Sequence, residues 1–476
     1  MIEVCWIQHG GEAPWVQQIA QALREHDIHV KFVATLRATH EEYLENGFES
    51  YFISQIFGDA EYFSAEDLAK LDRKYGPPLI KAIVDSDVHL TLLFGKNEDR
   101  KKQIIARAYK FWEQFLEEHP TDYFIVRETA TFVTRTAYNI ARTRGKPLLM
   151  RPDLAPDDSH FVMCDVGEEH CWQELLQAIE GGYKPLTDAQ RKQALELVAA
   201  RMKSNEGPAR LRKIVPPKLF PRKYLTSWLA ERSFRLSEDP IAIAEKRLER
   251  KFMVHRSLWN ITRRLFPYAQ PTNEPYVYFP LFFEDEALTL ANYRYWAKNM
   301  LSLVKEIAAS LPEGYYLYVK EHPGVPGEIS VSRLRALQRI PKVKVIDPIV
   351  QGQALIKGCQ AIIVLQGTAG WEAFLNRKPV IVLSAATFYS YSRLVYKVKD
   401  ICKLSEILCK ALTEGDAIYK RMEGEWLWFI HCVLSSLASG TFYRYEPPYF
   451  TPVNLENSKR IADGIAEKMK RMLNTS

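Results

Sequence analysis

The sequence predicts an α/β protein with two Rossmann-like domains that face a cleft and are separated by a basic helical insertion. Strand-like apolar segments alternate with helical segments near both ends of the chain, which is typical of parallel sheets. The chain has 476 residues, more than one hydrophobic core usually organises. We expect domains at 1–167 and 274–446, the insertion at 168–273, and a linker with a final helix at 447–476.

The first domain opens with a strand, a helix and a second strand, which together form a βαβ unit. This unit lacks a G-x-G-x-x-G fingerprint, so a nicotinamide cofactor is not indicated and no cofactor is expected. The stretch 48–107 mixes short apolar pieces with helical ones and predicts no clear order. The expected elements are strands at 2–8, 29–35, 122–126 and 146–150, and helices at 16–25 and 131–144.

In the second domain, strands are predicted at 276–282, 315–319 and 361–365, each followed by a polar or glycine-containing loop. Ligands of open parallel sheets bind beyond the carboxyl ends of the strands, so these loops should meet at one site. The loops read Phe283-Glu284-Asp285-Glu286, Lys320-Glu321-His322-Pro323 and Gln366-Gly367-Thr368-Ala369-Gly370-Trp371-Glu372.

These loops are suited to a phosphate. A Gly-Thr-Ala-Gly turn that opens a helix offers free backbone N–H groups at the positive end of the helix dipole. His322 can donate to the same phosphate, and Pro323 restricts the direction in which the chain leaves the strand. Each piece alone is also common as a structural turn, but their occurrence on successive strands favours a ligand site.

The Lys-Glu-His-Pro and Gly-Thr-Ala-Gly motifs quoted above, together with three other motifs of this region, are similar to those of the capsular polysaccharide biosynthesis family. The similarity covers about residues 274–390. That family includes bacterial transferases that move 3-deoxy-octulosonate (Kdo) from its CMP-activated form, and several sialyltransferase families share its His-Pro motif. Where this chain has Phe283, members often have Gln or His, which leaves the donor sugar open. The motifs are Tyr276-Val277-Tyr278-Phe279-Pro280-Leu281, Leu311-Pro312-Glu313-Gly314, Val319-Lys320-Glu321-His322-Pro323, Gly367-Thr368-Ala369-Gly370-Trp371-Glu372-Ala373 and Lys378-Pro379-Val380.

The resemblance implies a glycosyltransferase of the GT-B architecture that acts in bacterial surface or capsular polysaccharide biosynthesis. It would transfer Kdo or a related nonulosonate from a CMP-activated donor to a glycan or glycolipid acceptor. Two alternatives stay open: a UDP- or GDP-sugar-dependent transferase or epimerase of the same fold, and a non-catalytic glycan-binding scaffold of the export assembly.

On this interpretation the second domain binds the donor. His322, the N–H groups of Gly367 to Ala369 and the Thr368 hydroxyl would bind its phosphate. Glu372 would accept the ribose hydroxyls, or serve as a helix N-terminal carboxylate. Lys320 would neutralise either Glu321 or the donor. The predicted donor site comprises Lys320, His322, Pro323, Gln366, Gly367, Thr368, Ala369 and Glu372.

A carboxylate should accept the proton of the acceptor hydroxyl. Glu12 and Glu128 follow strands of the first domain, as does Asp153, while Glu284 and Glu286 lie nearer the predicted donor site. We take Glu128, Glu12 and Glu286 as the candidate catalytic residues.

No metal is expected. The seven cysteines form no C-x-x-C pair, which argues against a zinc site or a disulfide scaffold. Asp85-Ser86-Asp87 has the D-x-D spacing of metal-dependent transferases, but a polar turn is the favoured interpretation.

Basic charge is concentrated in residues 191–264, which contain 19 Lys and Arg against 7 Asp and Glu. Interleaved aromatic and aliphatic residues suit an anionic membrane surface or an acidic glycolipid, and a solvated helical insertion is the alternative. No nucleic-acid reader motif accompanies the charge.

The predicted location is cytoplasmic, with peripheral contact at the inner face of the cell membrane. The N-terminus reads as a strand instead of a signal peptide. No apolar run reaches the roughly 18 residues that span a bilayer. The nearest, 426–438, contains His431 and is expected to form a buried helix.

Overall fold

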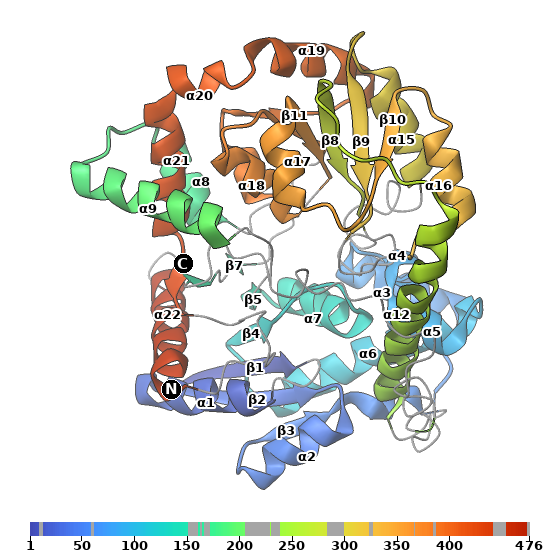
Figure 1. The fold of residues 1–476 in the computed structure, drawn as a ribbon. Coiled ribbons are helices and arrows are strands. Elements are labelled where there is room, and N and C mark those ends of the chain that lie inside the picture. Colours follow the sequence, from blue (N-terminus) through green and yellow to red (C-terminus); the bar gives the residue numbers. More distant parts are fainter. Residues whose placement is uncertain are drawn as a thin grey trace.

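The fold consists of two six-stranded sheets with helices on their faces (Figure 1). The computed structural model describes residues 1–8, 13–58, 61–150, 160–161, 164–165, 172–204, 229, 239–282, 299–322, 327–365, 367–383, 387–440 and 454–473. The predicted α/β class is confirmed, with two sheets built mainly of parallel strands.

The first sheet has the strand order β3-β2-β1-β4-β5-β7. Neighbours from β3 to β5 are parallel, and β7 is antiparallel to β5. The order turns back between β1 and β4, which is the point where open α/β sheets bind ligands. The strands are β1 (Ile2–Gln8), β2 (Ile28–Ala34), β3 (Ser50–Phe52), β4 (Tyr123–Val126), β5 (Leu148–Met150) and β7 (Cys164–Asp165).

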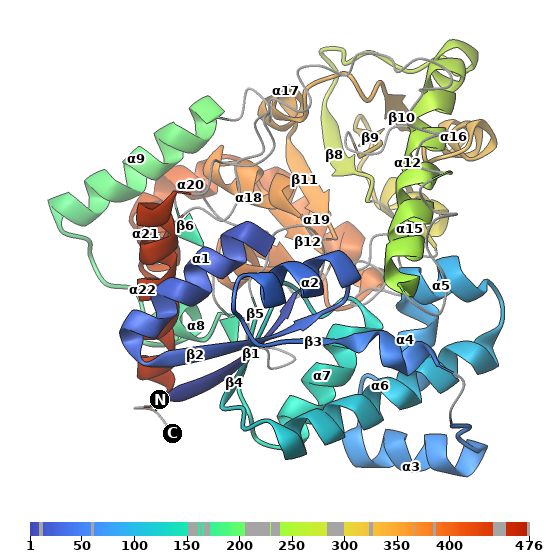
Figure 2. The ribbon, with the colours of Figure 1, turned by 90° about the horizontal axis from the view of Figure 1, so that it is seen from below.

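The first sheet is buried on both faces, as a parallel sheet must be. Val4 and Trp6 of β1 pack with helix α1 (Ala13–Leu23) and helix α22 (Leu455–Leu473). Cys5 and Ile7 of the same strand face a second cluster formed with α6 (Glu98–Glu118) and α7 (Phe132–Thr143) (Figure 2). The predicted terminal helix therefore returns to the first sheet.

Two differences from the sequence prediction have local causes. Helix α1 begins at Ala13 instead of Val16, because Pro14 lies in the first turn, where its missing N–H is not needed. The described part of 48–107 contains four α-helices, and three of them start at side-chain caps that a hydrophobic period does not reveal: Ser64, Asp87 and Asn97. Its elements are β3, α3 (Ala65–Tyr75), α4 (Ile80–Ser86), α5 (Val88–Phe94) and α6; α2 (Arg37–Glu45) precedes them.

The second sheet is parallel throughout, in the order β10-β9-β8-β11-β12-β13. Its order turns back between β8 and β11. Strand β9 extends one residue further than predicted because Lys320 pairs with Pro280 and Ile346 of its two neighbours. The strands are β8 (Tyr276–Pro280), β9 (Tyr316–Lys320), β10 (Val343–Ile346), β11 (Ala361–Val364), β12 (Val380–Val382) and β13 (Val395–Lys397).

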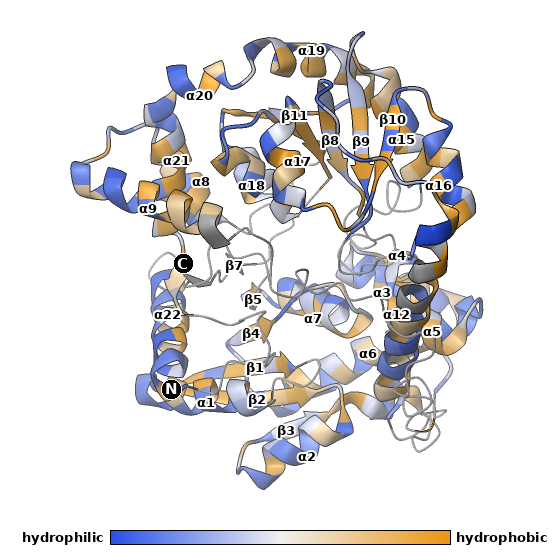
Figure 3. Cartoon of the chain, viewed as in Figure 1, coloured by the Kyte–Doolittle hydropathy of each residue, from blue (hydrophilic) through white to orange (hydrophobic). Residues whose placement is uncertain are grey.

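Helices cover both faces of this sheet, and the apolar residues concentrate between the layers (Figure 3). Tyr278 of β8 faces one cluster and Phe279 the other. The helices are α8 (Gln173–Glu180), α9 (Asp188–Ser204), α15 (Met300–Ala309), α16 (Val331–Gln338), α17 (Gly352–Gly358), α18 (Thr368–Leu375), α19 (Leu404–Glu414), α20 (Ala417–Arg421) and α21 (Glu423–Ser435).

Helix α21 is the buried helix expected at 426–438. Trp426 and Ile430 are almost fully buried and pack in the core of the second sheet, together with residues of α8 and α9. Within the described ranges, no helix is both long and apolar enough to cross a bilayer. A short antiparallel pair, β6 (His160–Phe161) with β14 (Ala438–Ser439), follows α21.

Helix α12 (Pro240–Leu265) connects the two halves of the protein (Figure 1). Its 26 residues make it about 39 Å long. At its start, Ile241 enters the core of the first sheet, and Arg247 Nη1 donates to the Leu92 carbonyl at 2.8 Å. Near its end, Arg263 pairs with Asp347, the residue after β10. The predicted insertion thus contributes helices to both halves.

Candidate functional site

The carboxyl ends of β9, β8 and β11 lie level with one another, at the place where the strand order of the second sheet reverses. Lys320 is in register with Pro280, and Ile362 of β11 with Tyr278 of β8. Since adjacent strands are about 4.8 Å apart, the ends of β9 and β11 are about 10 Å apart. The chain leaves β9 at Glu321 and β11 at Leu365, so the described starts of both loops lie at the same edge of the sheet, on either side of β8.

Lys320, the last residue of β9, is a buried cation. Its exposed fraction is 4%, and within the described part of the chain its ammonium group makes no hydrogen bond or ion pair. Burial lowers the pKa of Lys320 to about 8, although the charges of Asp347, Glu372 and Glu321 act in the opposite direction. A buried charge is unfavourable unless it is paired, so this position favours an anionic ligand.

Glu321 is not the counter-ion of Lys320. Its buried carboxylate accepts a 2.7 Å hydrogen bond from the Tyr268 hydroxyl and a 3.3 Å bond from the backbone N–H of Gly327. Burial raises the pKa of Glu321, and these bonds, with one from the Ile329 N–H, oppose that rise. Glu321 therefore fixes the loop that carries His322, which leaves the donor as the predicted partner of Lys320.

His322 lies directly after Glu321 and is exposed to solvent. Neighbouring protein atoms partly desolvate its imidazole, and this desolvation and the nearby Lys320 charge both lower the pKa of His322. At neutral pH the imidazole is thus uncharged and keeps one N–H donor. Pro323, also predicted for this site, lies outside the described residues.

The turn Gly367 to Gly370 requires both of its glycines. Gly367 has φ of 103°, which side chains rarely adopt, and its carbonyl accepts a 2.9 Å hydrogen bond from the Tyr389 hydroxyl. A Cβ on Gly370 would lie 2.5 Å from that hydroxyl oxygen. Tyr389 thereby holds the start of α18, while Gln366 lies outside the described residues.

The first turn of α18 is suited to bind an anion. Gly367 is the N-cap, and it has no side chain to accept a hydrogen bond from the first N–H groups. Thr368 is exposed and Ala369 is partly buried. An anion above this turn would receive these N–H groups together with the positive end of the helix dipole.

Glu372 lies one turn into α18 and is partly buried. It accepts a 2.6 Å hydrogen bond from Gln353 Nε2 of α17. Its negative charge raises the pKa of Lys320, against the effect of burial, and adds to burial in raising the pKa of Tyr278. The charge of Glu372 therefore acts on both Tyr278 and Lys320.

Of the candidate catalytic carboxylates, the structure describes Glu128. Glu128 follows β4, beside the point where the strand order of the first sheet reverses, and it is partly buried. Nearby His89 is held by a 2.8 Å contact between its Nε2 and Glu245 Oε1 of α12. Burial lowers the pKa of His89, but Glu245, Asp87 and Glu128 together raise it. Glu12 and Glu286 lie outside the described residues, as do Asp153 and Glu284.

Three residues near the site were missed by the sequence prediction: Asp347, Arg263 and Tyr268. Asp347 is 7% exposed, and its Oδ2 lies 3.2 Å from both Nε and Nη2 of Arg263. Asp347 follows β10, so a strand prediction at 343–346 would have indicated it. Arg263 and Tyr268 depend on the packing of α12 and the segment after it, for which the sequence has no motif.

The D-x-D match has a structural role. Asp87 accepts hydrogen bonds from the N–H groups of Leu90 and Phe132, at 2.7 and 2.6 Å, and so caps two helix starts. Asp85 pairs with Lys81 at 2.9 Å. Across the described ranges, no group of three or more His, Cys, Asp or Glu side chains is placed to hold a metal ion.

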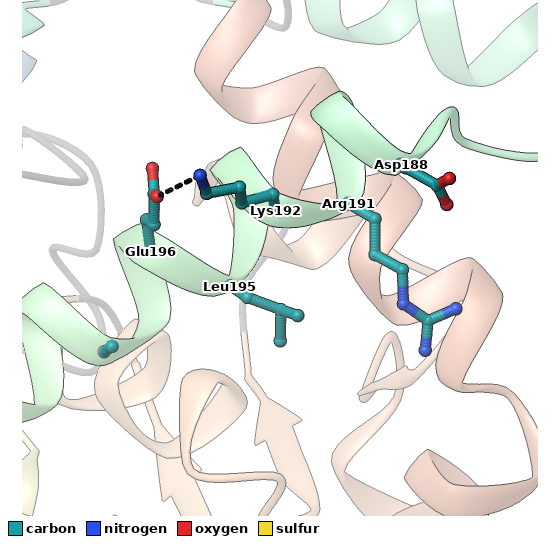
Figure 4. A pocket seen from close by; sticks show the side chains of 6 residues that line it. Asp188, Arg191, Lys192, Leu195 and Glu196 are labelled. Carbon is teal, nitrogen blue, oxygen red and sulfur yellow. Dashed lines mark ion pairs between the residues drawn. The ribbon is translucent and has the colours of Figure 1, made fainter.

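A surface hollow lies along α9 and is lined by residues of that helix alone (Figure 4). Arg191 and Lys192 extend from it, and Lys192 pairs with Glu196 at 3.9 Å. It contains none of the predicted site residues, and an open helix face does not enclose a ligand. The strand ends of the second sheet therefore remain the candidate site.

Solved structures of low similarity span most of the chain. UDP-GlcNAc 2-epimerase from Methanocaldococcus jannaschii is 12% identical, covers 86% of this chain and 92% of its own, and has a TM-score of 0.26. UDP-GlcNAc 2-epimerase from Neisseria meningitidis is 13% identical, covers 99% of this chain and 100% of its own, and has a TM-score of 0.29. The β-Kdo 2,7 transferase KpsC from Thermosulfurimonas dismutans is 11% identical, covers 68% of this chain and 85% of its own, and has a TM-score of 0.33. TM-scores this low do not support an argument about the fold. The fold assignment therefore rests on the strand order described above.

A search of curated proteins found no match. The sequence itself matches the family described as capsule polysaccharide biosynthesis protein over residues 231–395. That match contains α12, the strand ends β8, β9 and β11, and the first turn of α18. The resemblance predicted from the motifs is thereby confirmed for residues 231–395, which match the model of that family.

Proposed function

We propose that this protein is a glycosyltransferase of capsule or surface polysaccharide biosynthesis that uses a CMP-activated Kdo or related nonulosonate as its donor. The observation that carries the proposal is the buried Lys320 ammonium group, which has no anionic partner at bonding distance in the described part of the chain. The family match over 231–395 supports the capsule context. The acceptor is a glycan or glycolipid.

The donor phosphate binds at the strand ends of the second sheet. Lys320 supplies positive charge from the end of β9, and neutral His322 donates one N–H. The first N–H groups of α18 and the Thr368 hydroxyl donate from the other side. Glu372, held by Gln353, accepts the ribose hydroxyls. Pro323 and Gln366 belong to the same proposed site.

Transfer breaks the bond between the anomeric carbon and the phosphate oxygen. The nucleotide leaves with the electron pair, and its new negative charge is stabilised by donors that are already in place. The acceptor hydroxyl oxygen bonds to the anomeric carbon and gives its proton to a carboxylate. Glu128 is the base that we favour, and Glu12 and Glu286 remain candidates for this role.

The proposal is tested by calorimetric titration with CMP, UDP, GDP and ADP. We expect CMP to bind and His322→Ala to weaken that binding, because the variant removes a phosphate donor. The matched control is His431→Ala on α21, a helix outside the proposed site. Binding of UDP or GDP instead of CMP would favour the transferase or epimerase with another nucleotide. No binding of any nucleotide would favour the non-catalytic scaffold.

A second proposal concerns anionic membrane. Helix α12 exposes Leu258, Ile261 and Leu265, spaced three and four residues apart on one face, with exposed fractions of 47%, 41% and 57%. Arg264 beside them is also exposed. An apolar stripe beside basic side chains is suited to a membrane surface with anionic lipids.

Vesicle co-sedimentation tests this contact. We expect binding to vesicles that contain phosphatidylglycerol, weaker binding to pure phosphatidylcholine, and a loss of binding in Ile261→Ser/Leu265→Ser. Leu44→Ser on α2 is the control, because Leu44 is exposed to 50% and lies outside residues 191–264. Equal binding to both lipids would contradict the proposal.

A further inference from the structure

Asp347 follows Ile346, which is in register with Lys320 on the neighbouring strand, and it pairs with Arg263. Its Oδ2 accepts from Nε and Nη2 of Arg263, both at 3.2 Å, and its Oδ1 accepts from the Ile349 N–H at 3.0 Å. Its charge acts on Lys320, yet the two make no ion pair. Both carboxylate oxygens are therefore oriented by groups other than Lys320.

Arg263 is held on the part of α12 that contacts the His322 loop. Its guanidinium lies 5.8 Å from the ring centre of fully buried Trp259. Gly327, with φ of 85°, packs so closely on Trp259 that a Cβ there would lie 2.8 Å from the Trp259 Cβ. The N–H of Gly327 in turn donates to Glu321. Arg263, the loop and Lys320 thus belong to one packed unit.

We propose that Arg263 is a positioning residue of the donor site, which holds the Asp347 carboxylate away from Lys320 and so keeps the ammonium group available to the donor phosphate. This inference rests on the proposed function. It gives α12 a role at the donor site, through Asp347 and the loop.

The physical reason is competition between two anions for one cation. Without the guanidinium, Asp347 Oδ2 loses both of its charge-assisted hydrogen bonds. A buried carboxylate that has lost its cationic partner is strongly unfavourable, and Lys320 is the described cation whose interaction with it is already present. An internal ion pair would then cancel much of the charge that attracts phosphate.

The experiment compares four proteins by calorimetric titration with CMP and, in parallel, UDP at about pH 6.5, where Lys320 is protonated. They are wild type, Arg263→Gln, Arg263→Gln/Asp347→Asn, and the control Arg264→Gln at the next, exposed position. We expect Arg263→Gln to raise Kd about tenfold, or about 1.4 kcal/mol. The double variant should return to within about threefold of wild type, because an uncharged amide in place of the Asp347 carboxylate cannot neutralise Lys320. Arg264→Gln should bind like wild type.

The outcomes separate the inference from the proposed function. If wild type binds neither nucleotide, the donor site itself is wrong, and the inference fails with it. If wild type binds and Arg263→Gln is unchanged, only the inference is overturned. It is also overturned if the double variant binds as weakly as the single one, because Arg263 would then be a structural brace.

Thermal unfolding of each variant shows whether it is folded. If Arg263→Gln does not fold, the comparison uses Asp347→Asn as the reference. Adding Arg263→Gln to Asp347→Asn should change the CMP affinity by less than about twofold, since no carboxylate remains to be released. A further loss of about tenfold in that background would overturn the proposal.

Discussion

The hydroxyl of Tyr268 donates a 2.7 Å hydrogen bond to the carboxylate of Glu321, one residue before His322. The same carboxylate accepts from the N–H of Gly327, so it closes the loop that follows β9. A residue outside the predicted motifs thereby helps to set the position of the imidazole at the candidate site.

We expect Tyr268→Phe to lower the free energy of unfolding by about 1–3 kcal/mol, because a buried carboxylate loses a hydrogen bond. CMP affinity should fall as well, since the His322 loop loses an anchor. Thermal unfolding and calorimetric titration measure the two effects. Tyr62→Phe, at a position exposed to 71%, is the control. A variant with unchanged stability would show that Tyr268 does not hold the loop.

Replacing Lys320 should have opposite effects on ligand binding and stability. Lys320→Met removes a phosphate contact, so we expect the Kd for CMP to rise about 10- to 100-fold. It also removes a buried charge, so the unliganded protein should gain about 1–3 kcal/mol at neutral pH. Lys357→Met, at an exposed position of α17, is the control. A loss of stability together with unchanged binding would assign Lys320 a purely structural role.

Donor binding should weaken as pH rises through about 8, the pKa of Lys320. Below this pH the ammonium is charged in the free protein, whereas above it phosphate binding must be accompanied by proton uptake. The ionisable groups around it are Asp347, Glu372, Glu321 and His322. Titration with CMP between about pH 7 and about pH 9 measures this dependence. Lys320→Arg should flatten the profile, because Arg stays charged.

The same pKa predicts the pH dependence of folding, with a definite sign. The Lys320 pKa is lowered from 10.5 to about 8 on folding, so between these values the unfolded chain binds more protons. The contribution of Lys320 therefore makes the folded state more stable as pH rises from about 8 to about 10.5. The difference between wild type and Lys320→Met in denaturant unfolding should shrink over this range. A constant difference would contradict the buried, charged state of Lys320.

Glu128→Gln should reduce the rate of sugar transfer about 10²- to 10⁴-fold while CMP binding stays close to wild type. The reason is that the proposed base acts on the acceptor, across from the donor site. Transfer from a CMP-linked donor is measured at saturating donor, with Glu25→Gln on the surface as control. A transfer rate equal to wild type would remove Glu128 from the mechanism and favour Glu12 or Glu286.

The sequence predicted the parts of the site that local patterns encode. Apolar runs located the strands, and the residues just after them, Lys320 to His322 and Gly367 to Ala369, were expected at one edge because parallel strands end together. The helix start at Thr368 followed from the glycine turn. The exit of β4 at Glu128 was found in the same way.

The rest of the site depends on packing between distant segments. Arg263 meets Asp347 across 84 residues, and Tyr268 meets Glu321 across 53, so no spacing rule connects them. Strand β10 was not predicted, and with it Asp347 was missed. The burial that lowers the pKa of Lys320 is not visible in the Lys-Glu-His-Pro motif.

The central claim, that the strand ends of the second sheet bind a donor phosphate through Lys320, is tested most directly by calorimetric titration of wild type and Lys320→Met with CMP at about pH 7. We predict measurable CMP binding to wild type and a Kd about 10- to 100-fold higher in the variant, while the variant remains folded. Equal affinity of the two proteins for CMP, or no binding of any nucleotide to wild type, would contradict the claim.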